Sequence, residues 1–296
     1  MRTFITALAL VASFATTQTA AAQTPDLVAM KATCQTAAAQ PVSLRAETIR
    51  DLARTEANAF AKDTKKKELD VSNVLVGDVS QPAWKRVLDY YSITRLRGSL
   101  YVSHSADGAT KSYYETQLRP KVDAAITNPT DRAVIGDALT RAALYDTPWS
   151  AAFVSTIMKT AGFAADQWEA SAGHHGYIRA AILKGHEAGS TYAYAGCDPA
   201  WVRPRVGDLI CYSRGSGSPK TFETAVSRAT AGQSYTSHCD IVTSSDPAST
   251  TLQSIGGNVS DSVTKTDRVL GPGPSATAST LKKDAPWIAV LVLVRP

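Results

Sequence analysis

The chain has 296 residues, of which 44% are hydrophobic and 19% are charged, and its formal net charge is +5. This composition excludes an intrinsically disordered chain and is typical of a globular protein. The basic residues are scattered, and the one dense run, Lys65 to Lys67, is interpreted as a solvated helix end. Nucleic acid is therefore not an expected partner, whereas a positive chain suits an anionic surrounding such as a cell envelope.

The first 22 residues are typical of a secretory signal peptide. Arg2 precedes an uncharged run from Thr3 to Ala22, which ends in three alanines that suit a signal peptidase before Gln23. This run is too short and too rich in threonine to span a bilayer, and no later stretch approaches the roughly 18 apolar residues of a membrane helix. We therefore expect an exported protein, periplasmic or secreted, without a membrane span.

Residues 23–144 are expected to form a helical N-terminal region. The segment 23–40 shows little periodicity and is interpreted as the N-terminal lead of the mature chain. Helical spacing of apolar residues predicts four helices, over residues 42–61, 84–96, 120–126 and 131–144. Asn128 and Pro129 provide an N-cap and a break between the last two helices. No repeat or low-complexity linker follows, so this half is expected to pack directly on the next.

The pattern changes near residue 145, where a second region is predicted to run to residue 296. Two helices are predicted first, from Trp149 to Gly162 and from Gly176 to Gly185. Strands follow over residues 208–212, 239–243, 252–255 and 288–294, separated by segments rich in glycine, serine and proline. Helices followed by an antiparallel set of strands predict the α+β class.

Four cysteines in an exported chain are free to pair. Cys34 and Cys197 lie in polar, loop-like surroundings, which favours a bridge between them. Cys211 and Cys239 lie in apolar, strand-like runs and either face each other or are buried thiols. No cysteine spacing resembles a zinc site, and no metal or organic cofactor is expected.

Ser150 is the leading candidate for a nucleophile, because it stands at the start of an apolar helix. Backbone N–H groups and the helix dipole favour developing negative charge there. The alternative is that Ser150 only caps the helix. His238 opens an apolar strand and is a natural general base near neutral pH, although a strand-edge histidine is more often structural. Asn258 follows another strand and could orient the imidazole.

The motifs P-W-x-A-A-F-V-S, R-P-x-V-G-D-L-I, H-x-x-I-V and I-G-G-N-x-S-D-S-V follow one another between residues 148 and 263. In this order they resemble the NlpC and CHAP types of papain-like bacterial cell-wall peptidases and amidases. The resemblance covers residues 145–296 and implies a papain-like fold. It places Ser150 at the position of the nucleophilic cysteine, His238 at the base and Asn258 at the orienting residue. With serine at that position, the pattern also resembles a less characterised family of exported bacterial proteins.

Serine changes what the site requires. Its hydroxyl does not ionise at rest, so a base must take the proton during attack, and a carboxylate that supports the base favours this. Asp240 lies two residues from His238 on an alternating strand, and Asp261 is a second candidate. Cys239 or Cys211 as the nucleophile is a further alternative, although neither begins a helix.

Three more residues are candidates for a substrate groove. His174, His175 and Tyr177 stand at the start of a predicted helix that, in a papain-like fold, lies near the groove, although they could equally cap a surface helix. Trp149 precedes the nucleophile and is interpreted as core or groove wall.

Two functions are compatible with these residues. The first is a hydrolase of amide bonds in peptidoglycan peptides, and the second is an inactive module of the same fold that binds peptidoglycan or an envelope partner. A third hypothesis makes the N-terminal helical half an interaction surface. The sequence does not determine the oligomeric state.

Overall fold

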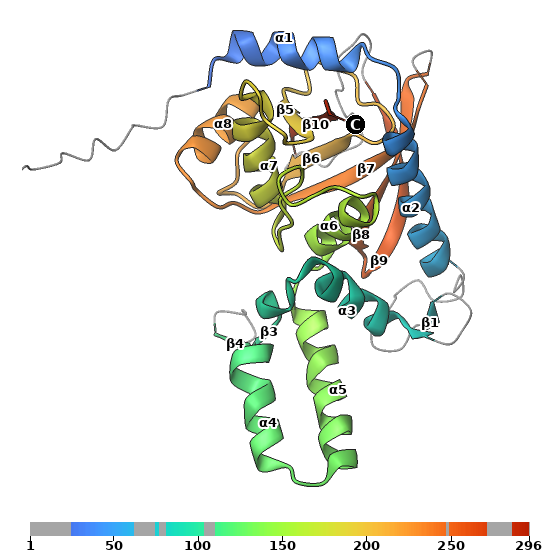
Figure 1. Ribbon diagram of the computed structural model, residues 1–296, viewed down its shortest axis with the longest axis vertical. Helices are drawn as coiled ribbons and strands as arrows, with labels where there is room; N and C mark the ends of the chain where they lie inside the picture. Colours follow the sequence, from blue (N-terminus) through green and yellow to red (C-terminus); the bar gives the residue numbers. More distant parts are fainter. Residues whose placement is uncertain are drawn as a thin grey trace, which may run out of the picture.

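The computed structural model describes residues 25–61, 75–76, 81–103, 110–246, 249–270 and 286–295. The predicted signal peptide lies outside these residues. The centre of the molecule is a six-stranded antiparallel sheet with the strand order β5-β10-β6-β7-β8-β9 (Figure 1). Its strands are β5 (Tyr194–Cys197), β6 (Leu209–Ser213), β7 (Ser237–Ser245), β8 (Thr251–Val259), β9 (Ser262–Val269) and β10 (Trp287–Leu293).

Each face of the sheet is covered by helices, because alternate side chains of the inner strands are apolar on both sides. Leu209 and Ile241 belong to the larger core, which α2 (Leu44–Ala61), α6 (Ser150–Thr160), α7 (His174–Leu183) and α8 (Phe222–Thr230) complete. Ile210 and Val242 belong to a second core on the opposite face, beneath α1 (Leu27–Ala38). The prediction of an α+β protein with helices on an antiparallel sheet is therefore confirmed.

The four helices expected in the first half are present. They are α2, α3 (Ala83–Thr94), α4 (Arg119–Ala125) and α5 (Pro129–Asp146). Asn128 caps α5 as expected, since its side chain accepts hydrogen bonds from the N–H groups of Thr130 and Asp131 at 2.9 and 3.2 Å.

The lead at residues 23–40, for which no helix is predicted, contains the helix α1 over most of its length. Only Met30 and Cys34 of α1 are buried, so the segment lacks the apolar stripe by which an amphipathic helix is recognised. Asp26 begins the helix by accepting a hydrogen bond from the N–H of Val28 at 2.8 Å. Tertiary contacts at two side chains thus hold a helix that periodicity did not indicate.

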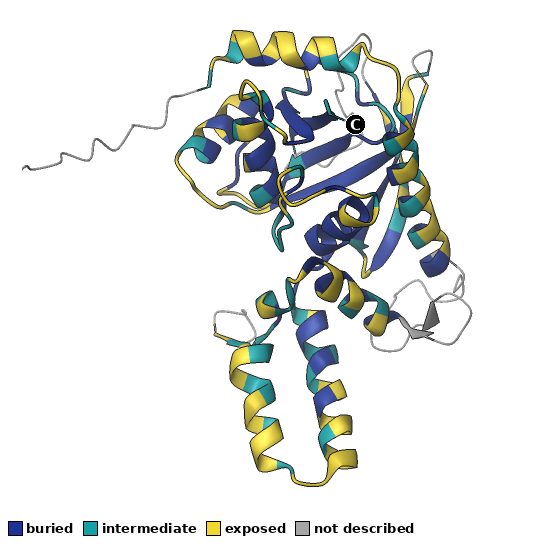
Figure 2. Cartoon of the chain, viewed as in Figure 1, coloured by how far each residue is buried: buried dark blue, intermediate teal, exposed yellow. Residues whose placement is uncertain are grey.

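Helices α4 and α5 form a hairpin that projects from the body of the molecule (Figure 1). Most of its surface is exposed, and burial is concentrated in the last turns of α5, where Ala143 and Leu144 enter the core (Figure 2). Shorter elements lie near its base or between the larger ones: β1 (Leu75–Val76), β2 (Gln81–Pro82), a 3₁₀ turn (Arg97–Ser99), β3 (Tyr101–Ser103), β4 (Lys111–Tyr113), a π-helical turn (Tyr114–Leu118) and a 3₁₀ turn (Lys184–His186). Within the described residues, none of the helices combines the length and the apolar character needed to cross a membrane.

Two disulfides join the sheet to itself and to α1. Cys34 is bonded to Cys197, which ties α1 to β5 and confirms the favoured pairing. Cys211 is bonded to Cys239, its register partner across β6 and β7. The alternative that one of these last two cysteines is a free nucleophile is therefore wrong.

Candidate functional site

Ser150 is the first residue of α6 and lies where this helix meets the sheet. The helix is apolar over most of its surface, so it packs closely on β7 and β8 and carries Ser150 into the interior, where the residue is 6% exposed. Trp149 occupies the N-cap position. The Ser150 hydroxyl is hydrogen-bonded to a histidine instead of a helix N–H group, so the interpretation of Ser150 as only a helix cap was wrong.

The histidine that contacts Ser150 is His174, the first residue of α7. Its Nε2 lies 2.6 Å from the Ser150 hydroxyl oxygen. Its Nδ1 accepts a hydrogen bond from the backbone N–H of Cys239 at 3.1 Å and also contacts the Tyr177 hydroxyl. A neutral imidazole that accepts at Nδ1 carries its proton on Nε2. His174 therefore donates to the Ser150 oxygen and leaves the hydroxyl hydrogen of Ser150 free for another acceptor.

His174 is held in this neutral form by its surroundings. Burial lowers the pKa of His174 well below its usual value, and the neighbouring His238 lowers it further. Tyr177 is fully buried behind the ring, and burial raises the pKa of its hydroxyl well above the usual value, so it remains a neutral hydrogen-bonding group. Tyr177 thus fixes the ring of His174 and does not carry charge.

His238 belongs to a second, buried polar cluster on β7. Its Nε2 lies 2.9 Å from Asp240 Oδ1, and the other carboxylate oxygen of Asp240 accepts from Arg268 Nη2 at 2.5 Å and from the Ser254 hydroxyl at 3.3 Å. Burial alone would raise the pKa of Asp240, but the hydrogen bond and charge of His238, together with the charge of Arg268, outweigh it and hold that pKa well below its usual range. Asp240 is therefore ionised and keeps a proton on the Nε2 of His238.

The two imidazoles are neighbours, but they contact different groups. Their ring centroids are 4.9 Å apart. Cys239 packs in the core on the α6 side of the sheet, so His238 and Asp240, which alternate with it along β7, point to the other side of the strand. Among the described residues, the Nδ1 of His238 is buried and has no hydrogen-bond partner, and no hydrogen bond joins His238 to Ser150.

Asn258 lies at the hairpin between β8 and β9 and reaches the start of α6. With its amide turned so that both groups are satisfied, the oxygen accepts from the N–H of Trp149 at 3.1 Å and the nitrogen donates to Asp261 Oδ1 at 3.1 Å. Asn258, Ser260 and Asp261 have φ angles of 55°, 51° and 56°, the left-handed region that asparagine and aspartate tolerate. Asn258 and Asp261 therefore position the helix start, while the carboxylate that orients His238 is Asp240.

Two glycines explain how β8 can lie so close to both clusters. A Cβ atom on Gly256 would lie 2.0 Å from Asp240 Oδ1 and 3.0 Å from His238 Nε2. A Cβ atom on Gly257 would lie 2.6 Å from the Cβ of Phe153 on α6. The pair of glycines in front of Asn258 is therefore a packing requirement of the site.

A pocket of about 360 Å³ opens onto Ser150 and His174. The described residues that line it are Ser99, Tyr101, Tyr113, Thr147, Pro148, Ser150, Ala172, Gly173, His174, His175, Arg214, Tyr235, Thr236 and Ser237. His174 and His175 thus lie where a groove was expected. Trp149 is buried in the core between Phe60 and Tyr90, with ring centroids 6.0 Å from each, so it supports the helix start without lining the pocket.

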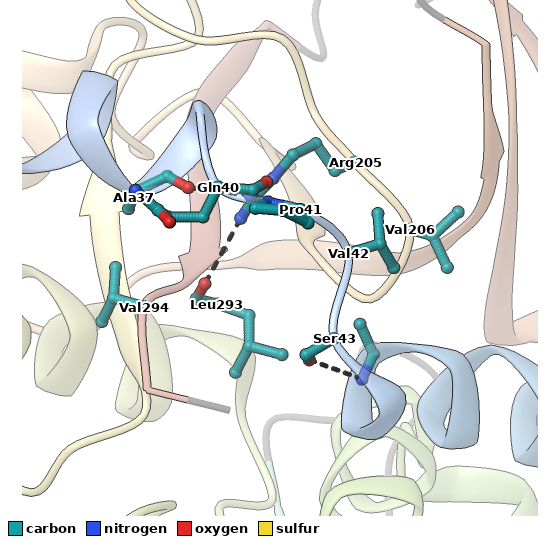
Figure 3. Close-up of a pocket in the computed structure, with 10 residues that line it drawn as sticks. Ala37, Gln40, Pro41, Val42, Ser43, Arg205, Val206, Leu293 and Val294 are labelled. Carbon is teal, nitrogen blue, oxygen red and sulfur yellow. Dashed lines mark hydrogen bonds between the residues drawn. The ribbon is translucent and has the colours of Figure 1, made fainter.

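A second hollow, of about 340 Å³, lies where the loop after α1 meets the strand β10 (Figure 3). Its principal polar group is Arg205, which donates to the carbonyl oxygens of Ala37 and Gln40 at 2.7 Å and of Leu293 at 3.3 Å. These hydrogen bonds hold the loop against the sheet. Arg205 is therefore a structural residue, and none of the catalytic candidates lines this hollow.

A family model described as "Uncharacterized protein conserved in bacteria (DUF2272)" matches residues 78–293, which include both polar clusters and the pocket. Neither the curated proteins nor the solved structures contain a match to the chain. Because the family model covers well over half of the sequence, the chain belongs to this bacterial family, DUF2272.

Proposed function

We propose that this protein is an exported hydrolase that cleaves amide bonds of peptidoglycan peptides, with Ser150 as the nucleophile and His238 as the base. The observation that carries the proposal is the cluster of His238, Asp240 and Arg268 beside the Ser150–His174 pair. An ionised carboxylate on one side of an imidazole is what a serine nucleophile needs from its base.

The hydrogen-bond directions favour His238 over His174 as the base. The Nδ1 lone pair of His174 is occupied by the N–H of Cys239, and its Nε2 bears a proton. The Nε2 of His238 bears a proton directed at Asp240, so the Nδ1 lone pair of His238 is free to accept one. Hydrogen bonds of this kind are often incomplete before substrate binds, and the proposal requires Ser150 and His238 to approach each other at that stage.

The reaction then follows the general course of acyl transfer. The Ser150 oxygen attacks the amide carbon while its proton passes to Nδ1 of His238, and a tetrahedral oxyanion forms. His238 returns that proton to the amine nitrogen as the C–N bond breaks, which leaves an ester on Ser150. Water, deprotonated in turn by His238, hydrolyses the ester and restores the serine. The negative charge of Asp240 balances the positive charge of the His238 imidazolium both when the ester forms and when it is hydrolysed.

The first turn of α6 supports the proposal because it offers hydrogen-bond donors for the oxyanion. The first N–H groups of a helix have no partner within it, and those of Ser150 and Ala151 belong to this turn. They carry the positive end of the helix dipole. The Nε2 of His174 lies 2.6 Å from the attacking oxygen of Ser150, so it orients the nucleophile and is separate from these oxyanion donors.

A papain-like assignment for residues 145–296 is part of this proposal. The resemblance to the NlpC and CHAP types implies a helix that begins with the nucleophile and packs on an antiparallel sheet, with a histidine at the start of a later strand. Here these are α6 with Ser150 and β7 with His238. Export is likewise a proposal, supported by the two disulfides, because disulfides persist in oxidising compartments. Peptidoglycan is the substrate that this resemblance and the positive charge favour.

The test is digestion of purified peptidoglycan by the mature protein, with products identified by mass spectrometry. Ser150→Ala and Ser150→Cys are compared with the natural protein, and Ser227→Ala, at an exposed position on α8 outside the pocket, is the matched control. New amine and carboxyl ends that vanish in Ser150→Ala and persist in Ser227→Ala are the expected result. Absence of such products with the natural protein would contradict the proposal.

A binding module is the second candidate, and one observation favours it. Ser150 has no hydrogen bond to His238, and the alternation of β7 turns His238 away from α6. In that case the natural protein would sediment with peptidoglycan and release no fragments. Activity that appears only in Ser150→Cys would identify an intact groove whose serine is inactive.

A further inference from the structure

Arg214 stands directly after β6 at the mouth of the pocket in which Ser150 lies. Its backbone is fixed, because its N–H donates to the carbonyl oxygen of Thr236 at 3.0 Å, just before β7 begins. Its side chain is exposed and lines the same pocket as Ser150 and His174. The backbone from which this guanidinium extends is therefore held at the rim of the pocket by two adjacent strands.

The contacts of Arg214 differ from those of the arginines that form ion pairs. Arg86, Arg97, Arg119 and Arg268 each have a carboxylate within 3.0 Å. The guanidinium of Arg214 instead donates to the hydroxyl of Tyr212 at 3.3 Å and lies 5.7 Å from the centre of that ring. The charge of Arg214 acts on His174, because it helps to lower the pKa of that histidine. Its effect is smaller than those of burial and of His238.

The pocket itself offers this arginine no anionic partner. No aspartate or glutamate is among the described residues that line it, and burial lowers the pKa of both His174 and His175, which keeps these rings neutral at neutral pH. The permanent positive charge of Arg214 thus stands alone among the lining residues that the structure describes. Part of the pocket wall is aromatic, because Tyr101 and Tyr113 line it and pack edge to face with their ring centroids 6.4 Å apart.

We propose that Arg214 binds a carboxylate of the substrate, so that the pocket selects peptides in which an acidic group lies next to the bond that Ser150 attacks. An arginine fork matches a carboxylate with two parallel hydrogen bonds, which adds orientation as well as attraction. The tyrosine walls suit the aliphatic part of such a residue. This assignment of substrate class rests on the proposed function of Ser150.

The test separates binding from cleavage. Two acetylated peptides that differ only in glutamate or glutamine beside a central amide bond are prepared in both L and D forms. Their affinities for Ser150→Ala are measured by calorimetry, because this variant holds the pocket without turnover. At least a ten-fold preference for one of the glutamate peptides is expected, and Arg214→Gln in the same background is expected to abolish it.

The matched control is Arg179→Gln, which removes the same charge from an exposed position on α7 outside the pocket. This variant is expected to keep the preference. Equal affinity for the glutamate and glutamine peptides, no binding of either, or an unchanged preference in the Arg214→Gln variant would overturn the assignment. Cleavage of peptidoglycan by the natural protein is scored separately, so a hydrolase without this preference and a binder with it are both recognised.

Discussion

Replacing Arg268 with methionine is expected to lower the free energy of unfolding by about 3–5 kcal/mol, the usual cost of breaking a buried ion pair. Arg268 Nη2 lies 2.5 Å from Asp240 Oδ2, and the two residues are 9% and 1% exposed. At a separation of charge centres of about 4 Å and an effective dielectric constant of about 20, their attraction is about 4 kcal/mol. Methionine replaces the aliphatic part of Arg268 but leaves the buried carboxylate without its cation.

The loss is expected to depend on pH. Burial acts to raise the pKa of Asp240, but His238 and Arg268 together hold it below that of an unfolded aspartate, about 3.9. A lowered pKa contributes stability above about pH 4, and this contribution disappears as the pH falls through the folded-state pKa. Without Arg268 the pKa of Asp240 rises, so the natural protein and the variant should differ most near neutral pH and less in acid.

Urea unfolding followed by tryptophan fluorescence between pH 3.5 and 7 measures both effects. Arg97→Met is the matched control, because its ion pair with Glu115 is partly exposed and should be worth at most about 1 kcal/mol. Combining Arg268→Met with Asp240→Asn should recover part of the loss. A loss for Arg268→Met no larger than that of the control, or strict additivity in the double variant, would refute the reasoning.

Two further predictions concern the base and the long-range disulfide. His238→Gln should reduce peptidoglycan cleavage by at least about 10²-fold while circular dichroism stays unchanged; retained cleavage would move the role of base to His174. Cys34→Ala should lower stability by about 2–4 kcal/mol in thermal or urea unfolding, because its bridge joins residues 163 positions apart; a variant as stable as the natural protein would show that α1 contributes little to the fold.

The strongly patterned parts of the fold could be predicted from the sequence. Strands β6, β7, β8 and β10 and the helices α2 to α7 carry dense apolar residues or recognisable caps, and they lie where the patterns place them. Strands β5 and β9 and helix α8 were not anticipated. Strand β9 lies at the edge of the sheet with polar residues along much of its length, so alternation alone is weak there.

The contacts among the candidate residues could be predicted only in part from the sequence. The pairing of His238 with Asp240 follows from strand alternation and is confirmed as a contact at 2.9 Å. The contact between Ser150 and His174 depends on how α7 docks against the sheet, which no local pattern specifies. Arg268 was missed because its partner is 28 residues away in the chain, on a strand that was itself not predicted.

The disulfide between Cys34 and Cys197 determines what happens to the protein after a protease cuts the chain between them. The exposed turn between α4 and α5, near Asn128, is the kind of site that proteases cut first. A single cut there leaves the piece that holds α1, α2 and α3 covalently joined to the piece that holds Ser150 and the sheet. Such a nicked protein runs as one band on a non-reducing gel and as two after reduction, and its two pieces cannot diffuse apart.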